Sequence, residues 1–194
     1  MNLTAVGKCL SVGADPSPDA VGDFDLVVLV SAEHQHAGEK FPTNVLRCPL
    51  PDDDQPSTET IQRAQRCAER VAYALCPFSV PFELWKKFSP PPPPASASNP
   101  PLLKTPEPVE PQRVLVTCEE GMNRSLLVAG MALVLTGEQR TGKDAREYLQ
   151  QLRGPESFRS PGYRRALDRF YPDEYARFRS PPLPAPPRGG MILG

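Results

Sequence analysis

The sequence has 194 residues, which suits one domain of ordinary size, and its formal net charge is −1. A charge so close to zero argues against bulk electrostatic attraction to nucleic acid or to a membrane surface. No apolar run is long enough to span a bilayer, and the first residues lack the basic and apolar regions of a secretion signal. The five cysteines show no metal-ligand spacing. We therefore expect a cytoplasmic protein with reduced thiols and with no metal or organic cofactor.

The first part of the chain predicts strands of a sheet. Residues 1–22 form an N-terminal segment in which Leu3, Val6 and residues 9–12 offer a possible short edge strand. Residues 24–30 are a dense aliphatic run, which is typical of a strand buried on both faces of a parallel sheet. The only two histidines follow at His34 and His36, and we favour a solvated loop there because zinc needs more ligands than these two.

Another strand is predicted at residues 45–50, and three adjacent aspartates follow it at residues 52–54. They suit a solvated turn before a helix, with Asp54 or Ser57 as the helix N-cap. Residues 58–75 then carry apolar side chains three and four positions apart. This spacing predicts an amphipathic helix with one face on the core.

The composition of the chain changes after this helix. Residues 78–88 are too apolar for a free linker and predict a short extra helix or a hydrophobic flap against the domain. Residues 89–111 contain five consecutive prolines and little that could fill a core, so we expect an extended insertion there. This proline-rich insertion is either a passive loop or a ligand for a polyproline-binding module.

The most informative stretch surrounds the fifth cysteine. Residues 114–117 predict a short buried strand and residues 126–135 a buried helix, and the loop between them opens with Cys118 and closes with Arg124. Peptide N–H groups of such a loop can turn inward around an anion at the helix N-terminus, and Gly121 permits the backbone conformation required. Inward amides, a helix N-terminus and a guanidinium all stabilise a nucleophilic thiolate. The stretch predicts a phosphate-binding loop with a thiol at its floor.

The sequence resembles the cysteine-dependent protein tyrosine phosphatase superfamily, and Cys118, Arg124 and Ser125 are the residues that match its motif. Within it, the resemblance is to the dual-specificity-like branch with the motif His-Cys-x5-Arg-Ser/Thr. The resemblance implies that Cys118 attacks phosphorus, that Arg124 binds the phosphate and that Ser125 assists departure of the thiolate. Thr117 stands where most of the family has histidine, so the cysteine lacks the group that usually orients it.

The resemblance also implies a general acid and a set of residues that contact the substrate. The three aspartates lie where these phosphatases carry the acid that protonates the leaving oxygen, and Asp53 and Asp52 rank ahead of Asp54. Proton donation of this kind contributes about 10² to 10⁴ in rate. A loop after the first long strand flanks the site in such phosphatases, so Glu33 or His34 is a further candidate for substrate contact. The expected substrate-binding residues are Glu119, Glu120, Gly121, Met122, Asn123 and Arg124.

Further helices are predicted after the buried helix. Residues 144–152 have helical spacing, and Ser160 is expected to cap another helix that begins with Pro161. Residues 171–178 predict a short last helix, and residues 180–194 a flexible tail rich in proline and glycine.

Together these elements predict a single α/β domain over residues 23–179. We expect a mainly parallel sheet of four or five strands, with helices on both faces. Ligands of open sheets bind at the C-terminal ends of parallel strands, which is where the cysteine loop begins.

The predicted function is a dual-specificity-like protein phosphatase that hydrolyses phosphotyrosine, phosphoserine or phosphothreonine through a phosphocysteine intermediate. Glu119 and Glu120 disfavour multiply phosphorylated inositol, so phosphorylated proteins or peptides are the expected partners, rather than membranes or nucleic acid. Two alternatives stay open. The loop from Gly121 to Arg124 also resembles that of metal-independent RNA 5′-triphosphatases, although only the arginines near residue 160 offer a basic approach. The other alternative is a phosphate-binding adaptor in which Thr117 has weakened catalysis.

Overall fold

The computed structural model describes residues 3–14, 21–32, 44–76 and 110–170. These ranges contain one sheet and four helices. Several predictions lie wholly or mostly outside them, namely those for the loop with His34 and His36, the apolar segment 78–88, the insertion 89–111, the helix 171–178 and the tail 180–194.

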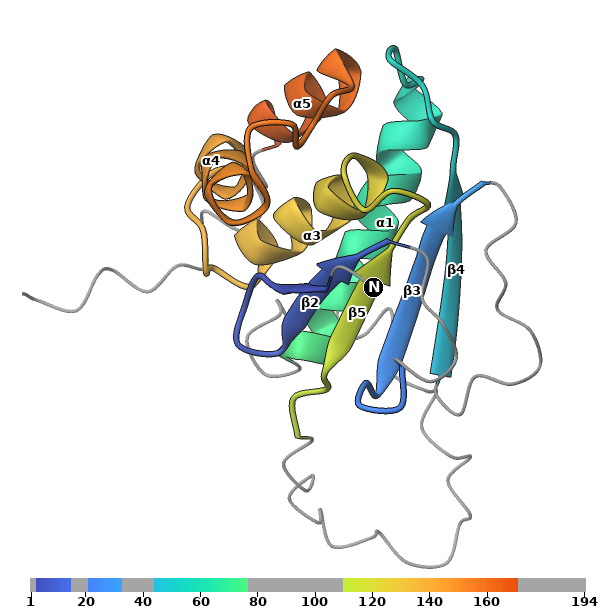
Figure 1. The fold of residues 1–194 in the computed structure, drawn as a ribbon, viewed down its shortest axis with the longest axis vertical. Helices are drawn as coiled ribbons and strands as arrows, with labels where there is room; N and C mark the ends of the chain where they lie inside the picture. Colours follow the sequence, from blue (N-terminus) through green and yellow to red (C-terminus); the bar gives the residue numbers. More distant parts are fainter. Residues whose placement is uncertain (1–2, 15–20, 33–43, 77–109, 171–194) are drawn as a thin grey trace, which may run out of the picture.

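A five-stranded sheet forms the centre of the described structure, in the order β1-β2-β5-β3-β4 (Figure 1). All neighbouring strands pair in parallel except β1 and β2. The predicted α/β class with a mainly parallel sheet of four or five strands is therefore confirmed. The strands are β1 (Thr4–Ala5), β2 (Leu10–Gly13), β3 (Leu26–Ser31), β4 (Asn44–Leu50) and β5 (Val114–Thr117).

The N-terminal segment, predicted to hold one edge strand, contains two strands, of which only β1 is at the edge. β2 pairs with β5, with Leu10 opposite Val114, so it has a neighbour on each side. β1 takes the edge by pairing antiparallel with β2. An apolar run of four residues carries too little pattern to tell an interior strand from an edge strand.

Four helices surround the sheet within the described ranges, and their capping residues agree with the sequence. α1 begins where the amphipathic pattern begins, and its N-cap is Ser57 rather than Asp54, because the Ser57 hydroxyl accepts from the Thr60 amide. Ser160 caps α5 in the same way, with Pro161 as the first helical residue. None of these helices is both long and apolar enough to cross a bilayer. The helices are α1 (Thr58–Leu75), α3 (Arg124–Leu135), α4 (Gly142–Arg153) and α5 (Pro161–Asp168).

The described helices cover one face of the sheet. Val28, Val30 and Val116 belong to the large core cluster that also contains buried side chains of all four helices. Val27 and Leu115 belong to a second, smaller cluster to which no described helix contributes. Helices were expected on both faces, and within the described ranges they cover only one.

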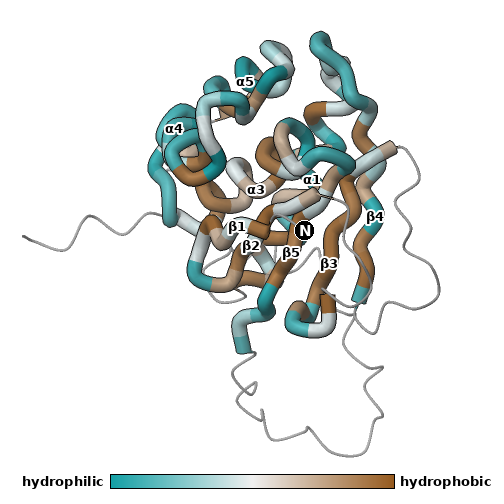
Figure 2. The backbone as a smooth tube through the Cα atoms, in the orientation of Figure 1, coloured by the Kyte–Doolittle hydropathy of each residue, from teal (hydrophilic) through white to brown (hydrophobic). Residues whose placement is uncertain are grey.

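α3 is the central helix of the domain, and it starts at the functional loop. All twelve of its residues are buried, because it packs against the sheet, α1, α4 and α5. Figure 2 shows this contrast, with an apolar sheet and α3 inside and the more hydrophilic α4 and α5 outside. The core of the domain therefore fixes the start of α3 from several sides.

The C-terminal ends of the parallel strands meet at one edge of the sheet. β5 continues into residues 118–124, which we call the cysteine loop, and β4 continues into residues 51–57, which we call the aspartate loop. The end of β3 is joined to the cysteine loop, because the Glu119 amide donates to the Ser31 hydroxyl at 3.3 Å. The topology thus brings the two loops singled out in the sequence to the same edge.

Candidate active site

Cys118 opens the cysteine loop and is buried at the end of β5, with a relative exposure of 1%. Its Sγ accepts a hydrogen bond from the Gly121 N–H at 3.1 Å and lies 3.3 Å from the Ser125 Oγ. The backbone amide of Cys118 donates to the Gly13 carbonyl of β2. The thiol therefore faces the inside of the loop, where a peptide N–H and a hydroxyl contact it.

Gly121 makes this loop possible. Its φ angle is 72°, a conformation that a side chain would resist. A Cβ at this position would also lie 2.7 Å from the carbonyl carbon of Gly13. Only glycine satisfies both the conformation and the close approach of β2.

Arg124 closes the cysteine loop and is the first residue of α3. It is 1% exposed, and its Nη1 donates to the Leu50 carbonyl at the end of β4 at 3.4 Å. Its Nη2 lies 3.6 Å from an Asp52 carboxylate oxygen and 3.7 Å from a Glu119 carboxylate oxygen. The guanidinium thus points inward, between the cysteine loop and the aspartate loop. Two carboxylates compensate for its burial.

The three aspartates differ in what their carboxylates contact. The carboxylate of Asp52 lies beside the Arg124 guanidinium at 3.6 Å. The carboxylate of Asp53 is turned toward its own loop and accepts from the Gln55 amide at 2.8 Å. Asp54 is exposed and does not cap α1, since Ser57 does. Of the three, Asp52 is the one whose carboxylate the structure joins to the cysteine loop.

Helix α5 holds the aspartate loop through backbone carbonyls. The Tyr163 hydroxyl donates to the Pro51 carbonyl, and the Ser160 hydroxyl donates to the Asp53 carbonyl at 2.9 Å. Burial raises the pKa of Tyr163 to about 12, so the phenol stays neutral and remains a donor over the physiological pH range. These two bonds fix the backbone of the aspartate loop, and neither of them involves a carboxylate of the loop.

The segment before α5 also supports the cysteine loop. The Ser160 amide donates to the Asn123 side-chain oxygen at 3.1 Å, and the Phe158 amide donates to the Met122 carbonyl at 2.8 Å. Phe158 has a φ of 61°, which is uncommon for a residue with a side chain. The same short segment therefore contacts both loops and sets their separation.

Arg153, at the end of α4, contacts the cysteine loop from the side of β1. Its Nη2 donates to the Gly121 carbonyl at 3.2 Å, and its Nη1 donates to the Thr4 hydroxyl at 2.8 Å. The Gly121 peptide thus has its N–H directed at the thiol and its carbonyl held by a guanidinium. Arg153 is a positioning residue for the loop.

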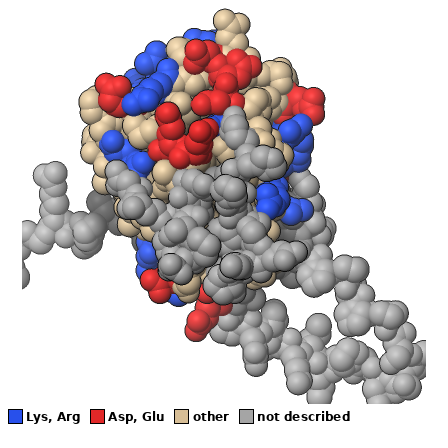
Figure 3. Space-filling model, turned by 45° about the vertical axis from the view of Figure 1, so that its right-hand side comes forward, with Lys and Arg blue, Asp and Glu red and all other residues tan. Residues whose placement is uncertain are grey.

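Acidic side chains border the loop at the surface. Glu119 and Glu120 are exposed, and Glu120 forms an ion pair with Arg159 at 3.4 Å. Arg159 also lies 3.6 Å from Glu156. Figure 3 shows acidic side chains gathered on the upper part of the described surface. The exposed charge on the border of the site is therefore mainly negative, although Arg153 and Arg159 also contact the cysteine loop.

Several residues of this arrangement were not found from the sequence. Ser31, Arg153 and the carbonyl of Gly13 contact the cysteine loop from elements far away in the chain. From the sequence, Ser160 was recognised only as the cap of a helix. No local pattern marks a side chain whose partner lies more than about a hundred positions away, as for Tyr163 and Pro51.

Comparisons with known proteins support the fold. No family model matches the sequence, and no curated protein matches it. Human DUSP28 superposes with a TM-score of 0.58 at 17% identity, over 85% of this chain and 89% of that chain. A mouse putative dual specificity phosphatase, complexed with zinc tungstate, gives 0.59 at 16% identity, over 91% and 90% of the two chains. The tyrosine phosphatase OH1 of Orf virus gives 0.50 at 16% identity, over 85% and 83%.

The chain therefore has the fold of the dual-specificity phosphatases. The resemblance inferred from Cys118, Arg124 and Ser125 is confirmed at the level of the fold. The cysteine loop occurs in this chain at the C-terminal end of the central strand β5, between that strand and the buried helix α3.

Proposed function

We propose that the protein is a cysteine-dependent phosphatase that hydrolyses phosphate monoesters of tyrosine, serine or threonine in proteins. The observation that carries the proposal is the environment of the Cys118 sulfur. A peptide N–H lies 3.1 Å and a hydroxyl 3.3 Å from it, and the same loop ends in a buried arginine. A sulfur nucleophile and a phosphate-binding guanidinium in one loop are the two parts that this chemistry requires.

In the first step, the Cys118 thiolate attacks phosphorus and forms an S–P bond while the ester P–O bond breaks. Arg124 binds two phosphoryl oxygens through its planar fork and follows them into the transition state. The departing oxygen takes a proton from an aspartic acid, for which we assign Asp52. Proton donation to the leaving group contributes about 10² to 10⁴ in rate.

In the second step, water attacks the phosphocysteine, and the S–P bond breaks. The same aspartate accepts the proton of the attacking water, so the carboxylic acid is regenerated. The Ser125 hydroxyl, 3.3 Å from Sγ, donates to the sulfur as it leaves as a thiolate. Inorganic phosphate is then released, and the enzyme returns to its starting state.

The choice of Asp52 over Asp53 rests on what each carboxylate contacts. Asp52 lies 3.6 Å from the guanidinium that would hold the phosphate. The Asp53 carboxylate already accepts from the Gln55 amide in a local turn. Asp53 is therefore assigned a role in the shape of the aspartate loop.

A protein substrate suits the acidic border better than a highly charged small molecule. Glu119 and Glu120 repel multiply phosphorylated headgroups, whereas one phosphate on a peptide can be held by Arg124 alone. The residues from Glu119 to Asn123 are proposed to contact the phosphate and the substrate around it.

The two alternatives differ from the proposal in what they need. An RNA 5′-triphosphatase needs basic side chains along the approach, and Arg159 is paired with Glu120 and Glu156. An adaptor needs a loop that binds phosphate without turnover, for which Thr117 in place of histidine is the only argument. Neither alternative is supported by as many contacts as the proposed phosphatase.

The test is hydrolysis of an aryl phosphate and of phosphopeptides by the full chain in the presence of a metal chelator. We expect turnover that is abolished in Cys118→Ser. Retained phosphopeptide binding without turnover in the unaltered protein would favour the adaptor. Faster release of phosphate from 5′-triphosphorylated RNA than from phosphopeptides would favour the triphosphatase.

A further inference from the structure

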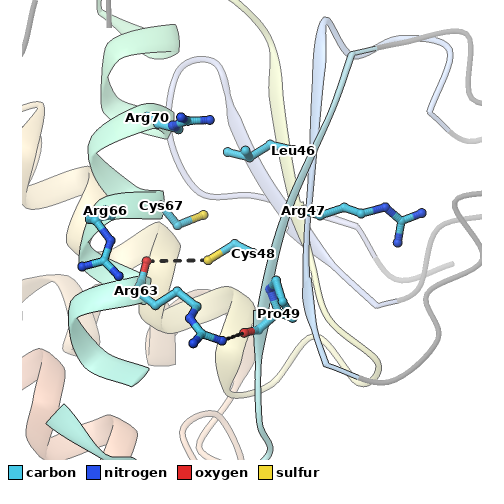
Figure 4. A pocket seen from close by; sticks show the side chains of 8 residues that line it. All are labelled: Leu46, Arg47, Cys48, Pro49, Arg63, Arg66, Cys67 and Arg70. Carbon is cyan, nitrogen blue, oxygen red and sulfur yellow. Dashed lines mark hydrogen bonds between the residues drawn. The ribbon is translucent and has the colours of Figure 1, made fainter. Parts of the chain in front are cut away.

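A second feature of the structure, away from Cys118, is a pocket between α1 and the edge strand β4. Its volume is about 340 Å³. Cys48 of β4 and Cys67 of α1 lie at its floor, and their sulfurs point into the space between the two elements (Figure 4). β4 pairs only with β3 in the described sheet, so the pocket lies at the edge of that sheet.

Arginine dominates the wall of the pocket. Arg63, Arg66 and Arg70 come from one side of α1 at helical spacing, and none of the eight described lining residues is acidic. Arg63 is held by the Pro49 carbonyl at 3.1 Å and by Glu59 at 3.0 Å. Arg66 and Arg70 are exposed. The described lining of the pocket therefore carries more positive than negative charge, in contrast to the acidic border of the cysteine loop.

The charge of these arginines affects the Cys48 thiol at the floor of the pocket. A hydrogen bond from Cys67 and the charges of Arg63, Arg66 and Arg70 lower the pKa of the Cys48 thiol, although burial opposes the shift. The arginines thus act together on one point inside the pocket. A negative group placed there would experience the same attraction.

The pocket continues into a groove along β4 and α1. A neighbouring hollow of about 460 Å³ shares Leu46 and Arg70 with it and is otherwise lined largely by apolar residues, including Val45 and Tyr73. Val45 is one of the exposed large hydrophobic side chains of the described structure. A groove with a cationic end and an apolar end suits a polypeptide, whose successive side chains differ in character. It suits nucleic acid less well, because a phosphate backbone requires basic side chains along its whole length.

We propose that this groove is a docking site for a phosphorylated polypeptide segment, with the phosphate in the arginine pocket and the flanking residues along the apolar hollow. Guanidinium groups bind phosphate with two hydrogen bonds in one plane, and a dianion matches several arginines better than a single carboxylate does. The site is separate from the cysteine loop and does not require turnover at Cys118.

The test uses nuclear magnetic resonance of the full chain carrying Cys118→Ser, titrated with a short peptide that contains one phosphoserine. We expect shifts of the backbone amides at residues 46–48 and 63–70, whether or not amides of the cysteine loop also shift. The double variant Arg66→Gln/Arg70→Gln should weaken binding at the groove at least about tenfold, since it removes two charge-assisted hydrogen-bond donors from the phosphate. The matched control is Arg165→Gln/Arg169→Gln, which removes two exposed arginines with the same spacing, in the last turn and at the C-cap of α5, and should leave groove binding unchanged.

The possible outcomes separate this proposal from the proposed function. Shifts confined to the cysteine loop would overturn the docking site and leave the phosphatase assignment intact. Shifts confined to the groove would support docking and count against phosphate binding by Arg124. Equal groove affinity for a peptide with glutamate in place of phosphoserine, or stronger groove binding of a short RNA, would overturn the phosphopeptide assignment.

Discussion

The cysteine loop and the aspartate loop are both required by the proposed chemistry, but they are held in opposite ways. The cysteine loop is built from the core, since Arg124 is 1% exposed and Gly121 leaves no room for a side chain against β2. The Asp52 side chain is 45% exposed, and its loop is held through backbone carbonyls by Tyr163 and Ser160. The loop proposed to bind phosphate is therefore fixed by the fold, whereas the proposed proton donor depends on a helix docked from outside.

The largest effect is expected from the proton donor. Asp52→Asn should lower kcat on phosphopeptides by about 10² to 10⁴, because the leaving oxygen would depart without a proton. Asp53→Asn and Asp54→Asn are the matched controls and should stay within about tenfold of the unaltered enzyme. Steady-state kinetics on one phosphopeptide measures all three, and a larger loss in Asp53→Asn would move the acid to that residue.

The next effect concerns the phosphate-binding arginine. Arg124→Lys keeps the charge but loses the planar fork, and kcat/KM should fall by about 10² to 10³. Arg159→Lys, which alters an exposed ion pair with Glu120, is the control and should change little. Circular dichroism would show whether both variants fold. If the Arg124 variant kept full activity, the guanidinium could not be the group that holds the phosphate.

Stability measurements test how closely the cysteine loop is held against β2. Gly121→Ala should cost at least about 2 kcal/mol in the free energy of unfolding, from the left-handed φ and the contact with Gly13. Gly137 has a similar φ of 80° but open space around it. Gly137→Ala should therefore cost only about 1 kcal/mol. Urea denaturation of both variants gives the comparison, and equal losses would show that the close approach of β2 contributes nothing.

The last effect is expected at the helix that holds the aspartate loop, and it develops only at alkaline pH. The pKa of Tyr163 is raised to about 12 in the folded protein, so its contribution to stability is complete below about pH 10, the unfolded value. It should be lost as the pH rises from about 10 to 12, because the unfolded chain then releases the proton first. The loss should be about 2 kcal/mol greater than in Tyr163→Phe. Urea midpoints measured across that pH range test this, and parallel curves for the two proteins would contradict it.

The sequence predicted best what is encoded by neighbouring residues. The strand, loop and helix around Cys118 have a local pattern, and the bounds of α1 follow from apolar spacing and the Ser57 cap. The N-terminal segment does supply an edge strand, β1, but the interior position of β2 was not predicted, because only its pairing with β5 distinguishes it from an edge strand.

The residues that hold the two loops in place could not be predicted from the sequence, for a related reason. Arg153 contacts Gly121 from 32 positions away, and Tyr163 contacts Pro51 from 112 positions away. Nothing in either local sequence marks these partners. The sequence could not select one of the three aspartates either, because adjacent identical residues are distinguished only by the direction in which the loop turns them.

The most direct measurement is to trap the intermediate. The enzyme is mixed with a phosphopeptide, quenched during turnover and digested, and the fragment that carries a phosphoryl group is identified by mass spectrometry. We expect the label on the sulfur of Cys118, and we expect it to be lost in Cys118→Ser. Turnover with no label on Cys118, or with the label on another residue, would contradict the account.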